Sequence, residues 1–589
     1  MLEYPFDASF IMQSKRAIKK QLLLNSGLID KKIALLSGTT IGEIKNILEL
    51  FLLDSGIKPE FFVGDYSRFY EDIIFDDGAL AAFEPDVIFI NTSTHNIENP
   101  PFAGESRESC SIKLENTFNR FKSVWQSAEK FKCPVIQNNF EYPQYRVMGN
   151  YDAVSPSGKI RFVNQLNEKM ADYAFSHKNL YINDFNYISA SYGIDKFSDP
   201  SYYNSYKYAI NPEAIPYLCH SVAAIIKSLF GKNKKALMLD LDNTLWHGVI
   251  GDDGVEGIKL GTESPEGIAH TELQRYAKEL SGIGVILGVC SKNEESAAKS
   301  GFDHPSSVLK VDDFLSFKAN WEPKSMNLVQ SAHDLNVGVD SFVFADDNPA
   351  EREIVRAANL GISVPELSAP ERFALTIANG AYFEITALSA DDIKRAEMYK
   401  QNLEREKLES GFTDYGAYLK SLNMRGYISA FTPGGIERIA QLANKTNQFN
   451  LTTRRYTQNE LEQRAANPNA ITLSGRLEDK FGDNGIVTEI VANIENTNAD
   501  IELWIMSCRV FKRELEYAMF DELVRICCAR GVKTITGSYF KTAKNVIVAN
   551  YYGTLGFEKI EQNGDDSVWR YSIPENYENK NKSIEVYNE

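Results

Sequence analysis

The sequence of 589 residues lacks the features of a membrane, secreted or nucleic-acid-binding protein. No run approaches the ~18 apolar residues of a membrane span, and residues 1–7 place no basic segment before an apolar one. We therefore expect no membrane span and no signal peptide. Acidic residues outnumber basic ones by 80 to 63, and the net charge of -17 argues against a nucleic-acid or anionic-membrane partner.

Cysteine and repeated segments are also scarce. The seven cysteines are odd in number and include no CxxC pair of the kind that binds metals, so we expect reduced thiols in a cytoplasmic enzyme. There is no obvious internal repeat or low-complexity block, and only residues 576–583 are expected to fray. At about 150 residues per domain, the length predicts three or four domains.

The most informative stretch is Leu237-Met-Leu-Asp240-Leu-Asp242-Asn-Thr244, an apolar run that ends in two carboxylates. Such a run is typical of a strand buried on both faces of a parallel sheet, and ligands bind beyond the carboxyl ends of such strands. Because residues i and i+2 of a strand point to the same side, the two carboxylates would repel each other unless a cation or a proton separates them. A divalent metal is the simplest solution, and Mg2+ sites combine one or two carboxylates with phosphate oxygens and waters.

Three later segments add groups to the same site. A second apolar strand ends at Cys290-Ser291, whose hydroxyl could hold a phosphate oxygen. Lys324 follows Trp-Glu-Pro at an expected helix start, and it is a better candidate for the cation than Lys318. A third apolar strand ends in Asp346-Asp347-Asn-Pro.

This order of motifs resembles the haloacid dehalogenase (HAD) superfamily over residues 232–385. The resemblance implies Asp240 as the nucleophile that forms an aspartyl-phosphate and Asp242 as general acid and base. It implies Ser291 and Lys324 as partners of the phosphate and its charge. These roles are chemically sound, because a carboxylate nucleophile divides phosphoryl transfer into two steps, while Mg2+ and lysine neutralise charge.

The resemblance also implies a metal site and further phosphate contacts. Asp347 is the favoured metal ligand from the third strand and Asp346 the alternative, beside Asp240 and Asp242. Additional side chains expected near the phosphate are those of Thr244, Asn293 and Asn348.

The intervals between the motifs are short. A hairpin suggested by Gly251-Asp-Asp-Gly254 and one helix over 272–280 fill the first interval, and the second is as short. Neither can hold a cap domain, which would need at least about 50 residues. The site should therefore be open to a large substrate or be covered by other domains.

Residues 1–231 predict a separate α/β domain of alternating strands and helices. It resembles an SGNH-hydrolase domain, with Ser37 at the nucleophile position and Asn91 near the oxyanion position. The family's late Asp-x-x-His would fall at Asp184-Phe-Asn-Tyr187, where Tyr replaces His. Because a serine without its base is a poor nucleophile, we expect a non-catalytic binding or docking domain.

Residues 386–424 predict a charged helical linker, and residues 425–575 predict a domain of strands around a helix at 515–524. The late segment 545–557 resembles the signature of GNAT acyltransferases, with Asn550 and Tyr552 as candidate ligand-binding residues. GNAT enzymes bind the coenzyme A pyrophosphate on a glycine-rich loop that opens a helix. Here that loop has no glycine, but acyl-CoA or a protein-borne phosphopantetheine could contact Arg509, Lys512 and Arg513; a basic turn without a ligand is the alternative.

Taken together, the chain resembles the FkbH-like proteins, whose HAD domain belongs to subfamily IIIC. The supporting segments are 238–248, 289–293, 345–349, Asn447-Gln-Phe-Asn450 and Met506-Ser-Cys-Arg509. The expected fold is α/β multidomain, with an SGNH-like doubly wound sheet, a capless Rossmann-like HAD domain and a GNAT-like α+β domain.

The FkbH-like resemblance implies a reaction. A glyceryl unit would be taken from 1,3-bisphosphoglycerate, with loss of phosphate, and loaded onto the thiol of an acyl carrier protein. Cys290 and, less directly, Cys508 are candidate acyl-holding thiols, although Cys290 also fits a small apolar residue that ends a buried strand. The alternative is a Mg2+-dependent phosphatase acting on a sugar phosphate or a large phosphorylated intermediate in surface polysaccharide synthesis.

Overall fold

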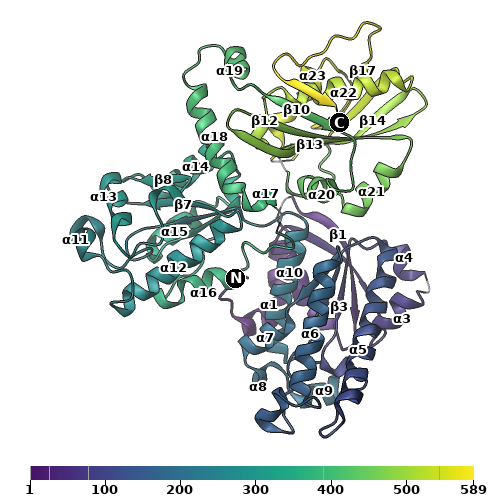
Figure 1. Ribbon diagram of the computed structural model, residues 1–589, viewed down its shortest axis with the longest axis vertical. Helices are drawn as coiled ribbons and strands as arrows, with labels where there is room; N and C mark the ends of the chain where they lie inside the picture. Colours follow the sequence, from purple (N-terminus) through teal and green to yellow (C-terminus); the bar gives the residue numbers. More distant parts are fainter. Residues whose placement is uncertain are drawn as a thin grey trace. The chain divides into compact units, whose positions relative to one another are not determined.

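A computed structural model describes residues 2–25, 27–76, 78–388, 390–446, 448–542 and 544–588, without the side chains of Ala390, Asp391, Ala396, Leu403 and Lys445. The chain divides into two compact units, Met1–Lys232 and Asn233–Glu589, and Figure 1 colours the first purple to blue and the second teal to yellow. None of the helices in the described ranges combines the length and apolar character needed to cross a lipid bilayer.

The described part of the first unit is built on a five-stranded parallel sheet in the order β2-β1-β3-β4-β5. Its strands are β1 (Ile29–Ser37), β2 (Ile57–Val63), β3 (Val87–Asn91), β4 (Val135–Asn138) and β5 (Leu180–Asn183). The helices are α1 (Ala8–Leu22), α2 (Gly42–Asp54), α3 (Phe69–Ile74), α4 (Ala79–Phe83), α5 (Arg107–Ala128), α6 (Lys159–Ser176), α7 (Phe185–Tyr192), α8 (Ile194–Phe197), α9 (Pro200–Tyr206) and α10 (Ile215–Leu229).

Helices cover both faces of this sheet, as expected for a doubly wound fold. All five residues of β3 are buried, and alternate side chains enter two cores. Val87 and Phe89 pack with α1, α2 and α10, whereas Ile88 and Ile90 pack with α5 and α6. A strand buried on both faces needs a continuous apolar run, and this run is why the sequence predicts a strand at β3.

A ladder of buried polar side chains crosses the carboxyl ends of four of these strands. Asn91 Nδ2 donates to Ser37 Oγ at 3.0 Å, Asn138 Nδ2 to Asn91 Oδ1 at 2.9 Å, and Asn183 Nδ2 to Asn138 Oδ1 at 2.8 Å. Each of the four residues ends its strand, and none is more than 4% exposed. Buried amides of this kind stabilise a fold only when their hydrogen bonds are satisfied, as they are here.

Ser37 is therefore held as a structural hydroxyl. Its Oγ also accepts from Thr39 N at 3.0 Å and donates to the Asn91 carbonyl at 3.1 Å. Asp184, at the position of the expected catalytic acid, caps α7 by accepting from Tyr187 N at 3.1 Å. These contacts give both side chains a role in the fold, and the expectation of a non-catalytic domain stays a prediction.

The second unit begins with a parallel sheet that has four strands in the described residues, in the order β8-β7-β6-β9. The strands are β6 (Ala236–Leu239), β7 (Ile286–Ser291), β8 (Ser316–Ala319) and β9 (Phe342–Ala345). The helices are α11 (Ile250–Gly257), α12 (Pro265–Gly282), α13 (Glu295–Ser300), α14 (Lys324–Asp334), α15 (Pro349–Ala357) and α16 (Phe373–Asn379). Apolar cores on both faces of the sheet place it as the middle layer of a Rossmann-like fold.

The remainder of the second unit is a mixed sheet flanked by helices. Its strands are β10 (Arg425–Ser429), β11 (Phe449–Asn450), β12 (Ala470–Asp479), β13 (Gly482–Glu495), β14 (Asn498–Met506), β15 (Thr534–Tyr539), β16 (Glu558–Asn563), β17 (Asp566–Ser572) and β18 (Glu585–Asn588). The helices are α17 (Ala390–Ile393), α18 (Arg395–Glu409), α19 (Tyr415–Ser421), α20 (Ile436–Lys445), α21 (Gln458–Ala466), α22 (Leu515–Ala529) and α23 (Tyr551–Thr554). β11 pairs with β14, while Asn447 of the family segment lies outside the described residues.

Two local expectations were wrong. The hairpin expected at Gly251–Gly254 is the helix α11, whose first turn carries Asp252 and Asp253, and acidic residues favour a helix start. The helical linker at 386–424 stays a prediction. Helices α17, α18 and α19 lie in this range, and Tyr418 and Leu419 of α19 belong to the core of the following sheet.

The segment expected to fray at 576–583 is also anchored. Lys580 N and Asn581 N donate to the Asp521 carboxylate at 2.9 and 3.0 Å. The chain then continues into β18, which pairs in parallel with β10. The polar composition of the segment suggested disorder, because contacts with a distant residue leave no local pattern in the sequence.

The ladder leads to a stability prediction. Ser37→Ala should destabilise the first unit by about 1–3 kcal/mol, because Asn91 Nδ2 would lose a buried acceptor. Calorimetry of the full chain should show a lower unfolding temperature for this variant. Ser111→Ala, which alters an exposed helical serine, should leave the unfolding temperature unchanged. An unchanged unfolding temperature for Ser37→Ala would mean that the ladder contributes nothing to stability.

Candidate active site

The candidate site lies at the carboxyl edge of the four-stranded sheet. Asp240 directly follows β6, Asp346 and Asp347 follow β9, and Ser291 ends β7. β6 lies between β7 and β9, and Leu239 pairs with Ala345, so the groups that follow these strands are brought together. The structure thus gathers side chains that are more than a hundred positions apart in the sequence, at the edge where parallel sheets bind ligands.

Three of the expected carboxylates form one cluster. Asp240, Asp346 and Asp347 each place an oxygen within 4.8 Å of the others, and they are the group in the described residues that could hold a metal. Asp240 is 6% exposed and also hydrogen-bonded by the Ser291 hydroxyl. Burial raises the pKa of all three carboxyls, and the proximity of a second carboxylate adds to that rise.

Lys324 is the cation of the cluster. Its Nζ lies 2.9 Å from Asp240 Oδ1 and 2.5 Å from Asp346 Oδ2, and only 3% of the residue is exposed. Burial alone would lower the lysine pKa, but the two carboxylates raise it well above its usual range. Lys318, the rival, instead pairs with Asp334 at 2.8 Å.

The donor set fits a divalent metal ion. Two buried carboxylates and the half-buried carboxylate of Asp347 share the cluster with one lysine, which leaves an excess of negative charge that a cation would neutralise. An all-oxygen set of this kind suits Mg2+. The raised carboxyl pKa values have the same origin as the affinity for a cation, because both follow from unbalanced negative charge.

The hydrogen bonds distinguish Asp346 from Asp347. Both oxygens of Asp346 are engaged, Oδ2 by Lys324 and Oδ1 by Asn348 N at 2.8 Å. Asp347 Oδ1 accepts from Thr244 Oγ1 at 3.3 Å, and Thr244 Oγ1 in turn accepts from Asp347 N. Asp347 therefore has a carboxylate oxygen available for a metal, whereas both oxygens of Asp346 are occupied and one of them orients Lys324.

Asp242 lies outside the carboxylate cluster of the described residues, although it was an expected metal ligand. Its Oδ1 accepts from Trp246 Nε1 at 2.9 Å and from Ile250 N at 3.0 Å, and its Oδ2 accepts from Asn293 Nδ2 at 2.8 Å. Asn293, an expected phosphate ligand, is thus bonded to Asp242. Asn348 was also expected to bind the phosphate, but its side chain caps α15 by accepting from Ala350 N.

Two functional positions were not found from the sequence. Trp246 donates to Asp242, and Arg352 stabilises the turn after β9 by donating to the carbonyls of Asp346 and Asp347 at 2.8 Å each. Arg352 is only 2% exposed. The clue to Trp246 was its place within the first motif, whereas Arg352 sits on a helix with an ordinary amphipathic pattern.

The candidate acyl thiols lie apart from the carboxylates. Cys290 is fully buried in the core on the opposite side of the sheet from Leu239, beside Met238 and Phe344. Its thiol donates to the Lys324 carbonyl at 3.6 Å, and burial raises its pKa well above the usual range. Neighbouring strand residues point to opposite faces, so Ser291 can face the site while Cys290 does not. The thiol of Cys508 donates to the Asn336 carbonyl at 3.3 Å.

The expected coenzyme-binding residues are largely engaged by the protein. Arg513 is 9% exposed and pairs with Asp479 at 3.5 Å, which also pairs with Arg405. The Lys512 carbonyl accepts from Tyr415 Oη at 2.9 Å.

The remaining members of this set differ in exposure. Arg509 Nε donates to Ser507 Oγ at 3.2 Å. Asn550 is exposed just before α23, whereas Tyr552 is buried. Arg509 and Arg513, together with Cys508, line one pocket of about 110 Å³. Lys512, Asn550 and Tyr552 are not among the residues that line it.

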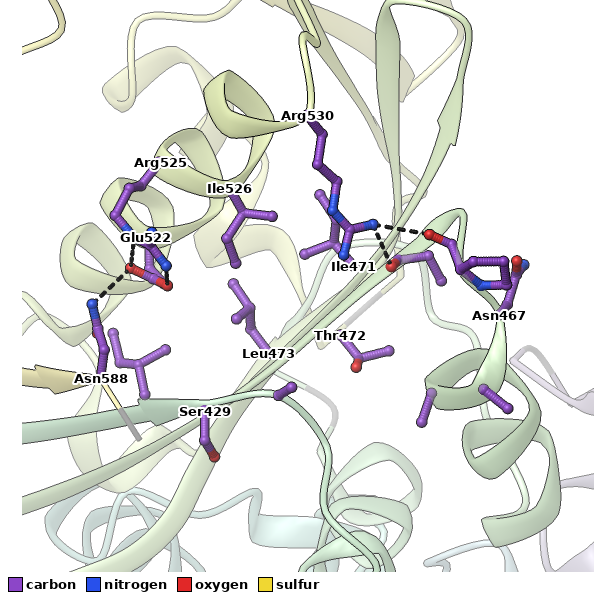
Figure 2. Close-up of a pocket in the computed structure, with 16 residues that line it drawn as sticks. Ser429, Asn467, Ile471, Thr472, Leu473, Glu522, Arg525, Ile526, Arg530 and Asn588 are labelled. Carbon is purple, nitrogen blue, oxygen red and sulfur yellow. Dashed lines mark hydrogen bonds and ion pairs between the residues drawn. The ribbon is translucent and has the colours of Figure 1, made fainter.

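The C-terminal sheet has a separate pocket of about 410 Å³ (Figure 2). Its apolar wall includes Ile471, Leu473 and Ile526. Its charged groups bond to the protein itself: Arg530 donates to two backbone carbonyls, and Glu522 pairs with Arg525 at 2.6 Å. The pocket is lined by residues outside the carboxylate cluster.

Comparison with known proteins identifies the family. The FkbH N-terminal domain family matches residues 32–227. The crystallised N-terminal part of the protein BF1531 from Bacteroides fragilis, which contains a phosphatase domain complexed with Mg, is 31% identical to this chain. The match covers 63% of this chain and 99% of that one, with a TM-score of 0.59. The chain belongs to the FkbH-like family of the HAD superfamily. This FkbH-like protein is therefore an enzyme with a HAD-type phosphatase domain, which confirms the expectation from the motifs.

Other structural matches concern the GNAT fold. The ribosomal-protein-S18-alanine N-acetyltransferase of Escherichia coli is 12% identical, covering 27% of this chain and 99% of that one, with a TM-score of 0.21. An aminoglycoside 6'-N-acetyltransferase complexed with coenzyme A is 15% identical. That match covers 26% of this chain and 99% of the acetyltransferase, also with a TM-score of 0.21. At these scores the likeness supports no conclusion about the FkbH-like protein. None of the curated proteins compared with the chain matched it.

Asp347, which follows β9, and Asp242 of the first motif should respond differently to metal. Asp347→Asn should weaken Mg2+ binding at least about 10-fold, because it removes charge from the cluster, whereas Asp242→Asn should leave binding nearly unchanged. The measurement is the rise in unfolding temperature with Mg2+ concentration, which reports binding without catalysis. Equal losses in the two variants would place Asp242 among the ligands.

Proposed function

We propose that the FkbH-like protein catalyses Mg2+-dependent phosphoryl transfer through an aspartyl-phosphate on Asp240. The observation that carries this proposal is the buried cluster in which Asp240 contacts Lys324 and Ser291 beside Asp346 and Asp347. Mg2+ held by Asp240 and Asp347 would supply charge neutralisation for the phosphate. Lys324 holds the opposite side of the anionic group, and its charge lowers the pKa of Asp240 against the rise that burial causes.

The chain's own residues account for the two chemical steps. In the first, an Asp240 oxygen attacks phosphorus, the bond to the leaving oxygen breaks, and Asp242 donates a proton to that oxygen. In the second, Asp242 takes a proton from water, whose oxygen attacks phosphorus and breaks the bond to Asp240. Inorganic phosphate leaves, and Asp242 carries the proton for the next cycle.

The substrate favoured by the family resemblance is an acyl phosphate such as 1,3-bisphosphoglycerate, with transfer of the glyceryl group to a carrier-protein thiol. The Asp240 steps would remove the phosphate ester, while the acyl-phosphate bond would break as the carrier thiolate attacks the carbonyl carbon and releases a second phosphate. The buried position of Cys290 favours a thiol that comes from outside the chain over an acyl-enzyme at this cysteine. The absence of a cap-sized insertion around the site is consistent with a large partner, since α11, α12 and α13 are the helices between Asp242 and Lys324 in the described residues.

The nucleophile assignment has a direct test. Asp240→Asn should lower Mg2+-dependent phosphate release by on the order of 10³-fold or more, because an amide cannot form the acyl-phosphate link. Ser37→Ala, which alters the other unit, should keep the wild-type rate. Phosphate release that survived the Asp240 substitution would show that another residue is the nucleophile.

The acyl-transfer step needs a different measurement. Intact-mass spectrometry of a phosphopantetheinylated acyl carrier protein, incubated with enzyme, Mg2+ and 1,3-bisphosphoglycerate, should show the mass gain of one glyceryl group. The same carrier with its phosphopantetheine thiol blocked should gain nothing. Steady phosphate release from sugar phosphates with no gain on the carrier would instead establish the stand-alone phosphatase.

A further inference from the structure

The carboxylate of Asp242 is fixed by three donors before any substrate binds. Trp246 Nε1 and Ile250 N donate to Oδ1, and Asn293 Nδ2 donates to Oδ2. Ile250 N belongs to the first turn of α11, which Gly254 interrupts with a non-helical backbone conformation. Hydrogen bonds to an ionised acceptor are among the stronger ones in proteins, so this arrangement restricts the carboxylate to one orientation.

The indole of Trp246 is itself held tightly. The side chain is fully buried, and its ring packs at 5.3 Å against Phe302 in an edge-on arrangement. A Cβ added at Gly301 would lie 2.7 Å from the ring, so glycine is required for this close approach. The N-H is therefore aimed by packing, and it donates from a ring that cannot swing away from Asp242.

Many enzymes complete their catalytic groups by closing a lid over the substrate. In this chain the segment from Trp246 to α11 holds the Asp242 carboxylate from inside the domain. It supplies the Trp246 indole and the first N-H of α11, and α11 packs against α13. The orientation of Asp242 thus comes from the fold and requires no movement of a cap.

We propose that Trp246 is a positioning residue for the second chemical step, the attack of water on the aspartyl-phosphate. The inference rests on the proposed phosphoryl-transfer function. In that step the Asp242 carboxylate removes a proton from water as the oxygen-phosphorus bond forms and the bond to Asp240 breaks. A general base must be held within hydrogen-bond reach of the proton it removes, and a misplacement of about 1 Å can cost on the order of 10²-fold in rate.

Trp246→Phe tests the proposal because it keeps the ring and removes the donor. With p-nitrophenyl phosphate, whose leaving group departs without a proton, the first step should stay near the wild-type rate. The second step should slow by roughly 10- to 100-fold, so that phosphoenzyme accumulates. Rapid quench with ³²P-labelled substrate should show a higher steady-state fraction of phosphoenzyme, together with a lower kcat and a lower KM.

Two further variants complete the experiment. Trp125→Phe is the matched control, because it removes another buried indole donor, the one that bonds Gln137 at 3.2 Å in the first unit, and should leave the kinetics unchanged. Asn293→Ala removes the donor to Asp242 Oδ2 and should raise the phosphoenzyme fraction in the same direction. If Trp246→Phe does not fold, the phosphoenzyme fraction of Asn293→Ala is measured in its place.

The outcomes separate this inference from the proposed function. An unchanged phosphoenzyme fraction in the folded Trp246→Phe and Asn293→Ala variants would overturn the positioning role, whatever the change in kcat, because a loss of packing alone slows both steps. The absence of any phosphoenzyme in the wild type, with phosphate release surviving in Asp240→Asn, would overturn the proposed function instead.

Discussion

The ion pairs of Lys324 with Asp240 and Asp346 are the constraint on which the second unit depends. Three carboxylates and one lysine share the end of a parallel sheet, and each of the four groups is at least partly withdrawn from water. Leaving such charges unpaired in the interior would be strongly unfavourable. The sheet order, the start of α14 and the turn after β9 all serve to keep these groups in contact.

Much of this arrangement could be predicted because parallel strands obey simple rules. An apolar run buried on both faces marks a strand, and the residue that follows it lies at the ligand-binding edge, which placed Asp240, Ser291 and Asp347 correctly at one edge. The side-chain alternation of a strand also contained the answer for Cys290, because adjacent residues cannot both face the site.

The parts that could not be predicted depend on contacts between distant residues. The Trp246 indole reaches Asp242 only because Gly301, more than fifty positions later, leaves room for its ring. The turn-like Gly-Asp-Asp-Gly composition favoured a hairpin, yet acidic residues also suit the first turn of a helix, and α11 forms. Likewise β18 follows a polar segment whose backbone is held by Asp521, and no local sequence pattern predicts that contact.

The amide ladder of the first unit bears on how such sequences are interpreted. The serine at the hydrolase position is joined to three asparagines across the sheet, so its hydroxyl is useful to the fold even where no base accompanies it. Such a serine contributes to the stability of the fold through its hydrogen bonds alone. Labelling by a probe for nucleophilic serines would therefore report on reactivity that the fold does not require of this hydroxyl.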